Sequence, residues 1–280
     1  MKARIGILTS GGDCPGLNAV LRGVVLAADK LGWEVIGFRD GFEGLLPPGD
    51  YVVLDRKSTE GIMAMGGTIL GTTNRGHFIA KVGAGDRAIV ASEVIARAKT
   101  VLDDLNVKAL VIVGGDGSMT TALQMQEAGI NCIGVPKTID NDIEATAMTF
   151  GFDSAVAEVM DALDRLHTTA TSHKRVMVVE VMGRHSGYLA LGASYGQPDI
   201  LLVPEHRLNV DMLVERIREI YDLQKHCVIV CGEGIVDEKG EELGAEHAST
   251  DPAGNVALSG ASEALRSVLI RRLGDAYFTS

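Results

Sequence analysis

Short apolar runs alternate along this chain with longer segments in which apolar residues recur at helical spacing. The short runs are rich in Val and Ile, which is typical of parallel strands covered on both faces. We predict strands at Arg4–Leu8, Glu34–Phe38, Ala109–Val113, Cys132–Val135, Val176–Val181, Ile200–Val203 and Cys227–Cys231. The longer segments predict helices over residues 17–31, 87–105, 118–128, 154–170, 186–195, 210–224 and 260–273.

Alternation of strands and helices indicates an α/β fold assembled from right-handed βαβ units. The chain has 280 residues, which is enough for two compact lobes, each with its own core. We expect two doubly wound lobes with mostly parallel sheets, one spanning residues 1–150 and the other residues 151–280. Residues 234–256 contain an acidic run and Asp251-Pro252, so this stretch is expected to be irregular.

Net charge limits the kinds of partner that we expect, and the cysteine pattern indicates the state of the thiols. The formal net charge of -11 disfavours binding to nucleic acid or to an anionic membrane surface, although a local basic cleft can still bind phosphates. No apolar run resembles a signal peptide or a membrane-spanning helix, so we expect a cytoplasmic protein with neither nucleic-acid nor membrane partners. The four cysteines include no C-x-x-C pair, which favours buried, reduced thiols.

Two glycine-rich turns follow predicted strands. The first, T-S-G-G-D-C-P-G-L-N, starts at Thr9, and its glycines allow an anion to approach backbone N–H groups where a helix begins. The second, Gly114-Gly115-Asp116-Gly117-Ser118, places a carboxylate at the carboxyl end of a strand, where α/β folds bind ligands. Asp116 is a candidate Mg²⁺ ligand. The alternatives are a tight turn without a ligand for the first and a helix-capping Asp for the second.

The segment Pro136-Lys137-Thr138-Ile139-Asp140-Asn141-Asp142 is the most specific motif. It places a Lys, a hydroxyl and two carboxylates within six residues. One carboxylate can accept an alcohol proton while the other organises a metal, and Lys and Thr can bind a transferring phosphoryl group. This combination predicts phosphoryl transfer. A polar loop with turn-forming Asp and Asn is the alternative.

Charged residues at other predicted strand ends complete the candidate set. Asn74 and Arg75 follow a Gly-Thr-Thr run, and Arg175 and Arg184 flank a predicted strand. Arginine is suited to binding phosphate through paired hydrogen bonds. Glu233 follows the last predicted strand and can accept hydrogen bonds from sugar hydroxyls. Each of these residues, taken alone, is also compatible with a solvated surface charge or a simple turn.

The ordered set of motifs resembles the bacterial 6-phosphofructokinase family. It comprises T-S-G-G-D-C-P-G-L-N, G-G-T-I-L-G, G-G-D-G-S, P-K-T-I-D-N-D, S-H-K-R and V-E-V-M-G-R, spread over about residues 5–235. Each motif is weak by itself, whereas the complete set in the family's order is highly specific. The resemblance implies two lobes with the active site between them, and a homodimer or homotetramer whose active sites are completed across subunits. It also implies phosphorylation of fructose 6-phosphate at its 1-hydroxyl by ATP with Mg²⁺, a reaction of glycolysis.

The resemblance further implies roles for individual residues. On the donor side, the residues that would contact ATP are Gly12, Asn74, Arg75, Gly115, Asp116, Gly117 and Ser118. Arg75 would meet the transition-state charge, and Asp116 would bind Mg²⁺. On the sugar side, the residues that would contact fructose 6-phosphate are Thr138, Ile139, Asp140, Arg175, Met182, Gly183, Arg184 and Glu233. Asp140 would take the proton from the 1-hydroxyl, assisted by Thr138 and Asp142, and Arg175 would reach the 6-phosphate bound to a neighbouring subunit.

One departure from the family pattern concerns the phosphoryl donor. In ATP-dependent bacterial members the catalytic loop usually reads P-G-T-I-D-N-D, whereas Lys137 replaces the glycine here, as in pyrophosphate-using relatives. Gly117 matches the ATP users, because pyrophosphate users usually carry Asp at that position. This mixture resembles the mixed-substrate subgroup. We expect ATP to be the working donor, with pyrophosphate as the alternative.

A second departure is that the chain ends at Ser280. Family members continue into a segment with an arginine and a histidine shortly before a Q-R-G-G run, and that segment supplies part of the 6-phosphate site. We therefore expect these residues to be a fragment that by itself is poorly stable and nearly inactive on fructose 6-phosphate.

Two other classes of protein stay open at this point. A non-catalytic sensor of sugar phosphates or nucleotides on the same fold would not need the base at Asp140. Diacylglycerol kinases and NAD kinases also use a G-G-D-G loop, but they lack P-K-T-I-D-N-D.

Overall fold

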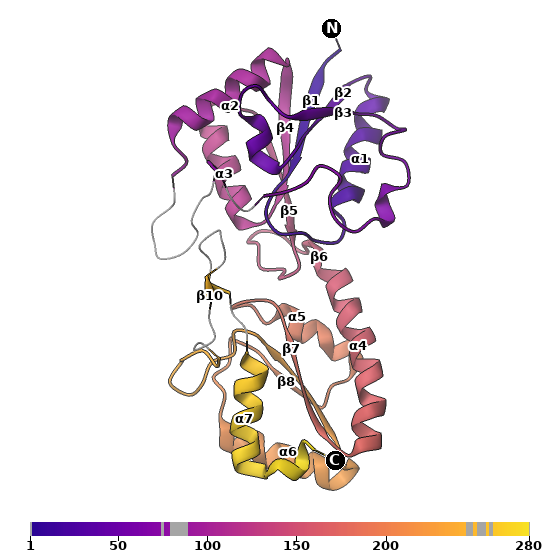
Figure 1. Cartoon of the computed structure of the whole chain (residues 1–280), viewed down its shortest axis with the longest axis vertical. Coiled ribbons are helices and arrows are strands. Elements are labelled where there is room, and N and C mark those ends of the chain that lie inside the picture. The colour runs from indigo at the N-terminus through magenta and orange to yellow at the C-terminus, as the bar shows by residue number, and fades with distance from the viewer. Residues whose placement is uncertain are drawn as a thin grey trace. The chain divides into compact units, whose positions relative to one another are not determined.

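A computed structural model of the chain describes residues 2–73, 76–78, 89–244, 249–250, 256–257 and 260–279 (Figure 1). These residues form two compact units. The first unit holds the described residues up to 138 together with residues 143–151. The second holds residues 139–142 and the described residues from 152 onward. The main division therefore lies between Gly151 and Phe152, whereas the short segment that contains Asp140 groups with the second unit.

The first unit is built on a six-stranded sheet in the order β3-β2-β1-β4-β5-β6. Its strands are β1 (Arg4–Thr9), β2 (Glu34–Phe38), β3 (Tyr51–Leu54), β4 (Val107–Gly114), β5 (Cys132–Thr138) and β6 (Phe150–Gly151). All neighbouring strands are parallel except β2 and β3, which pair antiparallel at one edge. In the centre, Thr9 of β1 pairs with Val113 of β4, so these two strands end together.

Helices cover both faces of this sheet. Successive side chains of a strand point to opposite faces, and here both sets are apolar and need to be buried. The helices are α1 (Leu17–Lys30), α2 (Ser92–Asp104) and α3 (Asp116–Glu127). Ile7 and Val111 share a core with Leu21 of α1, while Leu8 and Ile112 belong to the core with α2 and α3. Figure 1 shows α1 on one side of the sheet and the other two helices on the opposite side. The first unit is therefore doubly wound.

The second unit repeats this plan on a smaller, parallel sheet in the order β7-β9-β8. Its strands are β7 (Val176–Val181), β8 (Ile200–Leu202) and β9 (Cys227–Gly232), and its helices are α4 (Phe152–His173), α5 (Tyr188–Gly192), α6 (Val210–Gln224) and α7 (Ala261–Leu273). Val228 and Val230 are buried with residues of α4 and α5. Cys227 and Ile229, which point to the other face, are buried with residues of α6 and α7.

Local sequence determines where some of these helices begin and end. Asn209 precedes α6, and its side-chain oxygen accepts a hydrogen bond from the Met212 backbone N–H at 2.9 Å, which satisfies one unpaired donor of the first turn. Lys225 ends the same helix in a left-handed conformation. Within α4, the buried positions Val156, Leu163 and Ala170 are seven residues apart, so a narrow stripe of this helix faces the sheet.

The mostly parallel α/β fold predicted from the apolar pattern is confirmed, and all seven predicted strands are present. The pattern missed β3 and β6, because strands of four and two residues carry too little periodicity to be recognised. Described 3₁₀ helices that the pattern also missed are η1 (Gly41–Leu45), η2 (Ile62–Ala64) and η5 (Asp275–Tyr277).

Two predicted helices differ from the structure, and the stretch predicted to be irregular contains short paired segments. The helix predicted over residues 87–105 begins at Ser92, and residues 89–91 precede it in a non-helical conformation, while residues 87–88 lie outside the described part. The helix predicted over 186–195 is two short ones, α5 and the 3₁₀ helix η3 (Ala193–Gly196). Within 234–256, the described residues include a bridge between Val236 and Glu242 and the strand β10 (Ser249–Thr250), paired with β11 (Val256–Ala257).

None of the four cysteines forms a disulfide, and Cys14, Cys227 and Cys231 are buried as predicted, whereas Cys132 is only half-buried. Burial raises the pKa of Cys132 to about 11 and that of Cys227 and Cys231 to about 12. These three thiols therefore stay protonated near neutral pH and pack as small apolar groups. Within the described ranges, no helix has both the length and the apolar character that crossing a lipid bilayer requires.

Candidate active site

The first unit carries two glycine-containing turns at the carboxyl edge of its sheet. Residues 10–16 follow β1, and residues 114–118 lie at the end of the adjacent parallel strand β4. The Ser10 backbone N–H donates a hydrogen bond to the Val113 carbonyl at 2.9 Å, which joins the two strand ends. The two turns singled out in the sequence therefore lie side by side, in the place where α/β sheets bind ligands. Each leads into a helix whose first backbone N–H groups attract anions.

Packing requires glycine at two positions in these turns and leaves open space at a third. A Cβ on Gly114 would lie 2.4 Å from the Cβ of Ser118, and one on Gly16 would lie 2.8 Å from Cδ2 of Phe150. Gly16 also has a φ of 98°, which L side chains rarely adopt. At Gly12, by contrast, a Cβ would meet no atom within 4 Å. The backbone of Gly12 is therefore open to the approach of a ligand.

Helix α3 begins at Asp116, and Gly117 and Ser118 follow in its first turn. Asp116 is exposed, whereas Ser118 is buried. Mg²⁺ in phosphate-binding sites takes one or two carboxylates together with substrate oxygens and water. An exposed carboxylate between glycines at a strand end fits that mode. Across the described residues there is no group of three or more His, Cys, Asp and Glu that would enclose a metal without a substrate.

Lys137 places a buried positive charge beside both turns. It lies near the end of β5 and is 6% exposed, and its Nζ donates a hydrogen bond to the Gly12 carbonyl at 2.6 Å. A Cβ on Gly115 would lie 3.3 Å from the Lys137 carbonyl. The next residue, Thr138, ends β5, and its carbonyl accepts a hydrogen bond from Thr149 Oγ1 at 2.8 Å. The segment that is predicted to affect donor choice and catalysis therefore starts, at Lys137, next to the two glycine-containing turns.

The chain enters the second unit with the segment that carries Asp140. Asp140 is half-buried, and its backbone carbonyl accepts a hydrogen bond from Ser186 Oγ at 3.4 Å. Asn141 has a φ of 58°, a left-handed conformation that Asn tolerates better than most residues. Asp142 is exposed. The two carboxylates of the motif therefore differ in their environments, with Asp140 the more enclosed.

Glu233 holds the turn that follows β7. Its Oε1 accepts hydrogen bonds from the backbone N–H groups of Gly183, at 3.2 Å, and Arg184, at 2.8 Å. Arg184 has a φ of 50°, so the carboxylate stabilises an unusual backbone conformation. A Cβ on Gly234 would lie 2.0 Å from the Arg184 carbonyl oxygen. The turns after β7 and β9 therefore pack tightly against each other. Glu233 is expected from the sequence to bind sugar hydroxyls, and it also stabilises the turn that carries Gly183 and Arg184.

Burial raises the pKa of the Glu233 carboxyl above its ordinary value of 4.5. The backbone N–H groups of Arg184 and Gly183 oppose this rise, and the nearby negative charges of Asp140 and Glu180 add to it. The contribution of Asp140 also indicates that its side chain lies near the Glu233 carboxyl in the second unit.

Replacing Glu233 with Gln is expected to remove part of the pH dependence of stability. An acid whose pKa is higher in the folded chain than in the unfolded chain binds more protons when folded, so its contribution to stability declines as the pH rises. As the pH rises from 4.5 to the raised pKa of Glu233, the unfolding free energy of the unmodified protein should therefore fall more than that of Glu233→Gln. Thermal unfolding midpoints of both proteins, measured from about pH 4 to pH 8, check this.

The matched control is Glu215→Gln, on an exposed position of α6. Its unfolding profile should follow that of the unmodified protein at every pH. If Glu233→Gln also follows the unmodified profile, the raised pKa of Glu233 is wrong.

The structure separates the remaining predicted residues into four groups. Met182 and Arg184 are exposed at the carboxyl end of β7, next to the Glu233 turn. Arg175 precedes β7 and lies at the opposite end of that strand, so it does not join the Glu233 turn within its own unit. Asn74 and Arg75 lie outside the described residues. Ile139 packs with the core of α4 and α5.

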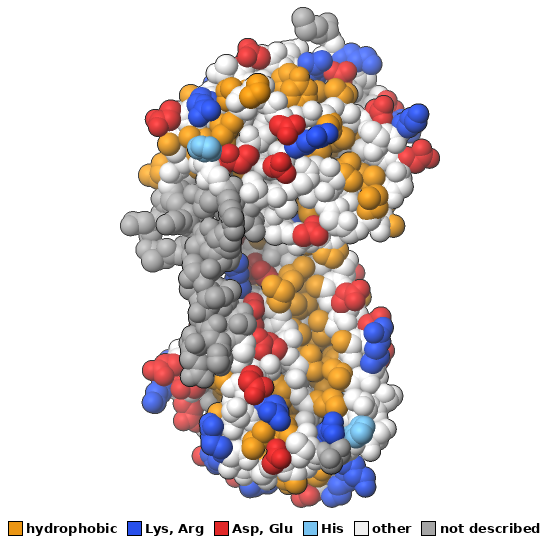
Figure 2. Space-filling model, in the orientation of Figure 1, with side chains coloured by type: hydrophobic (Ala, Val, Ile, Leu, Met, Phe, Trp, Pro, Cys, Tyr) orange, Lys and Arg blue, Asp and Glu red, His pale blue; other side chains and the backbone are white. Residues whose placement is uncertain are grey.

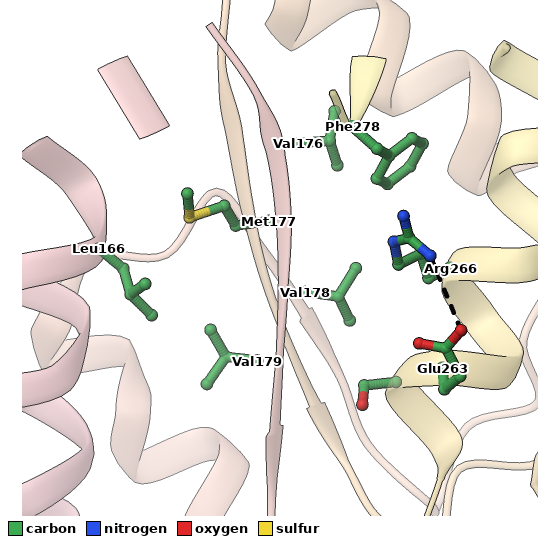
Figure 3. A pocket seen from close by; sticks show the side chains of 9 residues that line it. Leu166, Val176, Met177, Val178, Val179, Glu263, Arg266 and Phe278 are labelled. Carbon is green, nitrogen blue, oxygen red and sulfur yellow. Dashed lines mark ion pairs between the residues drawn. The ribbon is translucent and has the colours of Figure 1, made fainter. Parts of the chain in front are cut away.

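A pocket of about 270 Å³ lies elsewhere in the second unit, beside the edge strand β7. Leu166 of α4 and Arg266 of α7 line it from opposite faces of the sheet, and Figure 3 shows the β7 side chains between them. Its two charged side chains, Glu263 and Arg266, form an ion pair at 3.7 Å. None of the predicted catalytic residues lines this pocket, so we place the candidate active site at the turns described above.

Residues 4–274 match the sequence pattern of the Phosphofructokinase family. The chain belongs to the phosphofructokinase family. Members of this family are kinases that act on a sugar hydroxyl.

Individual relatives support this membership. An ATP-dependent 6-phosphofructokinase from Chloroflexus aggregans is 48% identical over 248 residues, which cover 86% of this chain and 68% of the relative. A pyrophosphate–fructose 6-phosphate 1-phosphotransferase from Streptomyces coelicolor is 41% identical over 275 residues, which cover 97% of this chain and 77% of the relative. The crystal structure of Pichia pastoris phosphofructokinase in the T-state matches with a TM-score of 0.81 and 27% identity, and this chain covers 30% of it.

Proposed function

We propose that this phosphofructokinase catalyses the ATP-dependent phosphorylation of fructose 6-phosphate at its 1-hydroxyl, giving fructose 1,6-bisphosphate in glycolysis. The observation that carries the proposal is the path of one continuous segment. It leaves the donor-side sheet at Lys137 and Thr138, beside Gly12 and Gly115, and places Asp140 close to Glu233 in the second unit. This path supports the proposal, because one short segment would then carry both the base for the alcohol and the residues beside the phosphate-binding turns.

In the proposed mechanism, Asp140 accepts the proton of the 1-hydroxyl while that oxygen forms its bond to the γ-phosphorus of ATP, and ADP leaves. Thr138 and Asp142 assist from the same segment, and Arg75 meets charge on the transferring group. Gly12, Asn74 and residues Gly115 to Ser118 hold the donor. Asp116 would hold Mg²⁺, which would supply positive charge to offset that of the phosphates.

On the acceptor side, we propose that Ile139, Met182, Gly183, Arg184 and Glu233 bind the sugar. The hydrogen bonds from Gly183 and Arg184 to Glu233 support this assignment, because they hold the turn in one conformation before the substrate arrives.

Pyrophosphate is the second candidate donor. Lys137 supports it, because a buried ammonium group bonded to the first donor turn adds charge where a compact phosphate would bind. Gly117 supports ATP, because a residue without a side chain leaves room for the nucleotide beyond the β-phosphate. The curated relatives include enzymes named for each donor.

A coupled assay with ATP or pyrophosphate as the donor, at equal Mg²⁺ and fructose 6-phosphate concentrations, tests the proposed function. We expect a higher kcat/KM with ATP. A higher kcat/KM with pyrophosphate would overturn the ATP-dependent reaction and support the pyrophosphate-dependent one. Binding of sugar phosphate or nucleotide without turnover by either donor, at concentrations that saturate both sites, would favour the non-catalytic sensor.

We further propose that the protein acts as a homodimer or homotetramer in the cytoplasm, with Arg175 binding the 6-phosphate in the neighbouring subunit. The position of Arg175, at the end of β7 opposite to Gly183, supports a role outside the sugar site of its own chain. Figure 2 shows hydrophobic side chains gathered on one face of the second unit. Tyr188, Leu191 and Tyr195, on α5 and η3, are between 50% and 76% exposed, and such apolar surface is typical of subunit interfaces.

A diacylglycerol kinase or NAD kinase is not supported. Membership of the phosphofructokinase family over residues 4–274 includes the whole Pro136–Asp142 motif, which those kinases lack.

A further inference from the structure

Two successive carbonyl groups of the glycine-rich turn after β1, those of Gly11 and Gly12, are held by side chains from distant parts of the chain. The Gly11 carbonyl accepts a hydrogen bond from Thr72 Oγ1 at 2.6 Å. The next carbonyl, that of Gly12, accepts one from Lys137 Nζ, also at 2.6 Å. Two successive peptide groups of this turn therefore have their orientations set from outside the turn.

These bonds determine where the backbone N–H groups of the turn point. In a trans peptide the carbonyl of one residue and the N–H of the next point in opposite directions. Because Thr72 holds the Gly11 carbonyl, the Gly12 N–H points away from Thr72. In the same way, the Asp13 N–H points away from Lys137. The space next to Gly12 is open, since an added Cβ would meet no atom within 4 Å, and a backbone N–H held in a fixed orientation beside such a space can bind an anion.

We infer that Thr72 is a positioning residue for the phosphoryl donor, and that its hydroxyl acts by holding the Gly11–Gly12 peptide in the orientation that binds phosphate. This inference rests on the proposed function, since it assumes that the Gly12 turn binds the donor. Thr72 is half-buried, and its bond to the Gly11 carbonyl places its hydroxyl on the side of the peptide opposite to the Gly12 N–H.

The segment that carries Thr72 is firmly attached to the sheet, which gives the hydroxyl a defined position. Asn18, 2% exposed at the start of α1, donates from Nδ2 to the carbonyls of Met65, at 3.1 Å, and Gly67, at 2.6 Å. Its Oδ1 accepts from the Ile69 N–H at 3.0 Å. Both N–H donors and the oxygen of this amide are therefore used to hold alternate residues of one loop.

A second attachment lies closer to Thr72. Thr9, fully buried at the end of β1, shares a hydrogen bond with Thr68 Oγ1 and donates to the Gly71 carbonyl, each at 2.9 Å. The peptide immediately before Thr72 is thus bonded to the strand that leads into the donor turn. The arrangement is preorganised, because neither attachment requires the donor to be present.

The test removes only the hydroxyl, through Thr72→Val, and restores it through Thr72→Ser. Binding of MgATP is measured by isothermal titration calorimetry, together with KM for ATP and for fructose 6-phosphate. We expect Thr72→Val to weaken MgATP binding about 3- to 10-fold, the range for one lost neutral hydrogen bond. Thr72→Ser should stay within about twofold of the unmodified protein, and KM for fructose 6-phosphate should change little.

The control is Thr59→Val, which removes a fully buried hydroxyl that donates to the Asp55 carbonyl at 2.7 Å and accepts from Arg22 Nη1 at 3.0 Å. It should leave MgATP affinity unchanged. Unaltered MgATP affinity in Thr72→Val, or an equal loss in Thr72→Val, Thr72→Ser and Thr59→Val, would overturn the inference alone. If the unmodified protein binds neither MgATP nor pyrophosphate, the proposed donor site fails and the inference fails with it.

Discussion

Asn in place of Asp140 is expected to lower kcat about 10²- to 10⁴-fold relative to the unmodified chain, the usual range for loss of a general base. The amide has the same shape as the carboxylate, but it cannot accept the proton of the 1-hydroxyl. The backbone of this residue is bonded through its carbonyl to Ser186, and that contact does not depend on the side chain. The loss should therefore appear in the chemical step, with a small change in KM for fructose 6-phosphate.

The steady-state rate and the binding of fructose 6-phosphate, measured on the same preparation, check this prediction. Glu144→Gln is the matched control, because it makes the same change at an exposed position shortly after the motif. It should keep the unmodified rate. Turnover of Asp140→Asn within about threefold of the unmodified chain would remove Asp140 from the role of base.

Asp in place of Gly117 is expected to weaken ATP binding about 10- to 100-fold, because a carboxylate would face the α-phosphate at short range. Gly117 lies in the first turn of α3, where an acidic residue stabilises a helix and Asp has a better helix propensity than Gly. Folding should therefore be preserved or improved, and the loss of affinity should not result from unfolding. Pyrophosphate has no nucleoside beyond its second phosphate, so its binding should be weakened much less.

Gly117→Asn separates the added volume from the added charge. It should lose less ATP affinity than Gly117→Asp, and the difference between the two should shrink at high salt as charges are screened. Equal ATP affinity in Gly117→Asp and the unmodified protein would contradict the placement of the nucleotide beside α3. Calorimetric titrations with MgATP and with pyrophosphate measure both effects.

Much of the fold and of the candidate site could be predicted from local sequence. Buried parallel strands are recognisable as apolar runs, so β2 and β7 have the bounds that were predicted. The glycine-rich turns follow directly from their strands, which places Gly12 and Asp116 at strand ends without any knowledge of distant contacts. The weaker cases were short or mixed segments. β3 has four residues at a sheet edge, and the apolar spacing of residues 87–105 begins before helix α2 does.

The sequence by itself determined the order of the three candidate motifs along the chain: a glycine-rich turn, a turn with a carboxylate, and the segment that carries Asp140. Only the tertiary structure decided which distant groups hold these turns in place. Thr72 is 61 residues from Gly11, Lys137 is 125 from Gly12, and Glu233 is 49 from Arg184. Spacing along a chain does not show which side chain will satisfy a given backbone group, because that depends on how parallel strands bring their carboxyl ends to one edge. For the same reason, Glu233 could be identified in the sequence as a strand-end carboxylate, while its burial, its two backbone bonds and its raised pKa follow from the packing of the turns after β7 and β9.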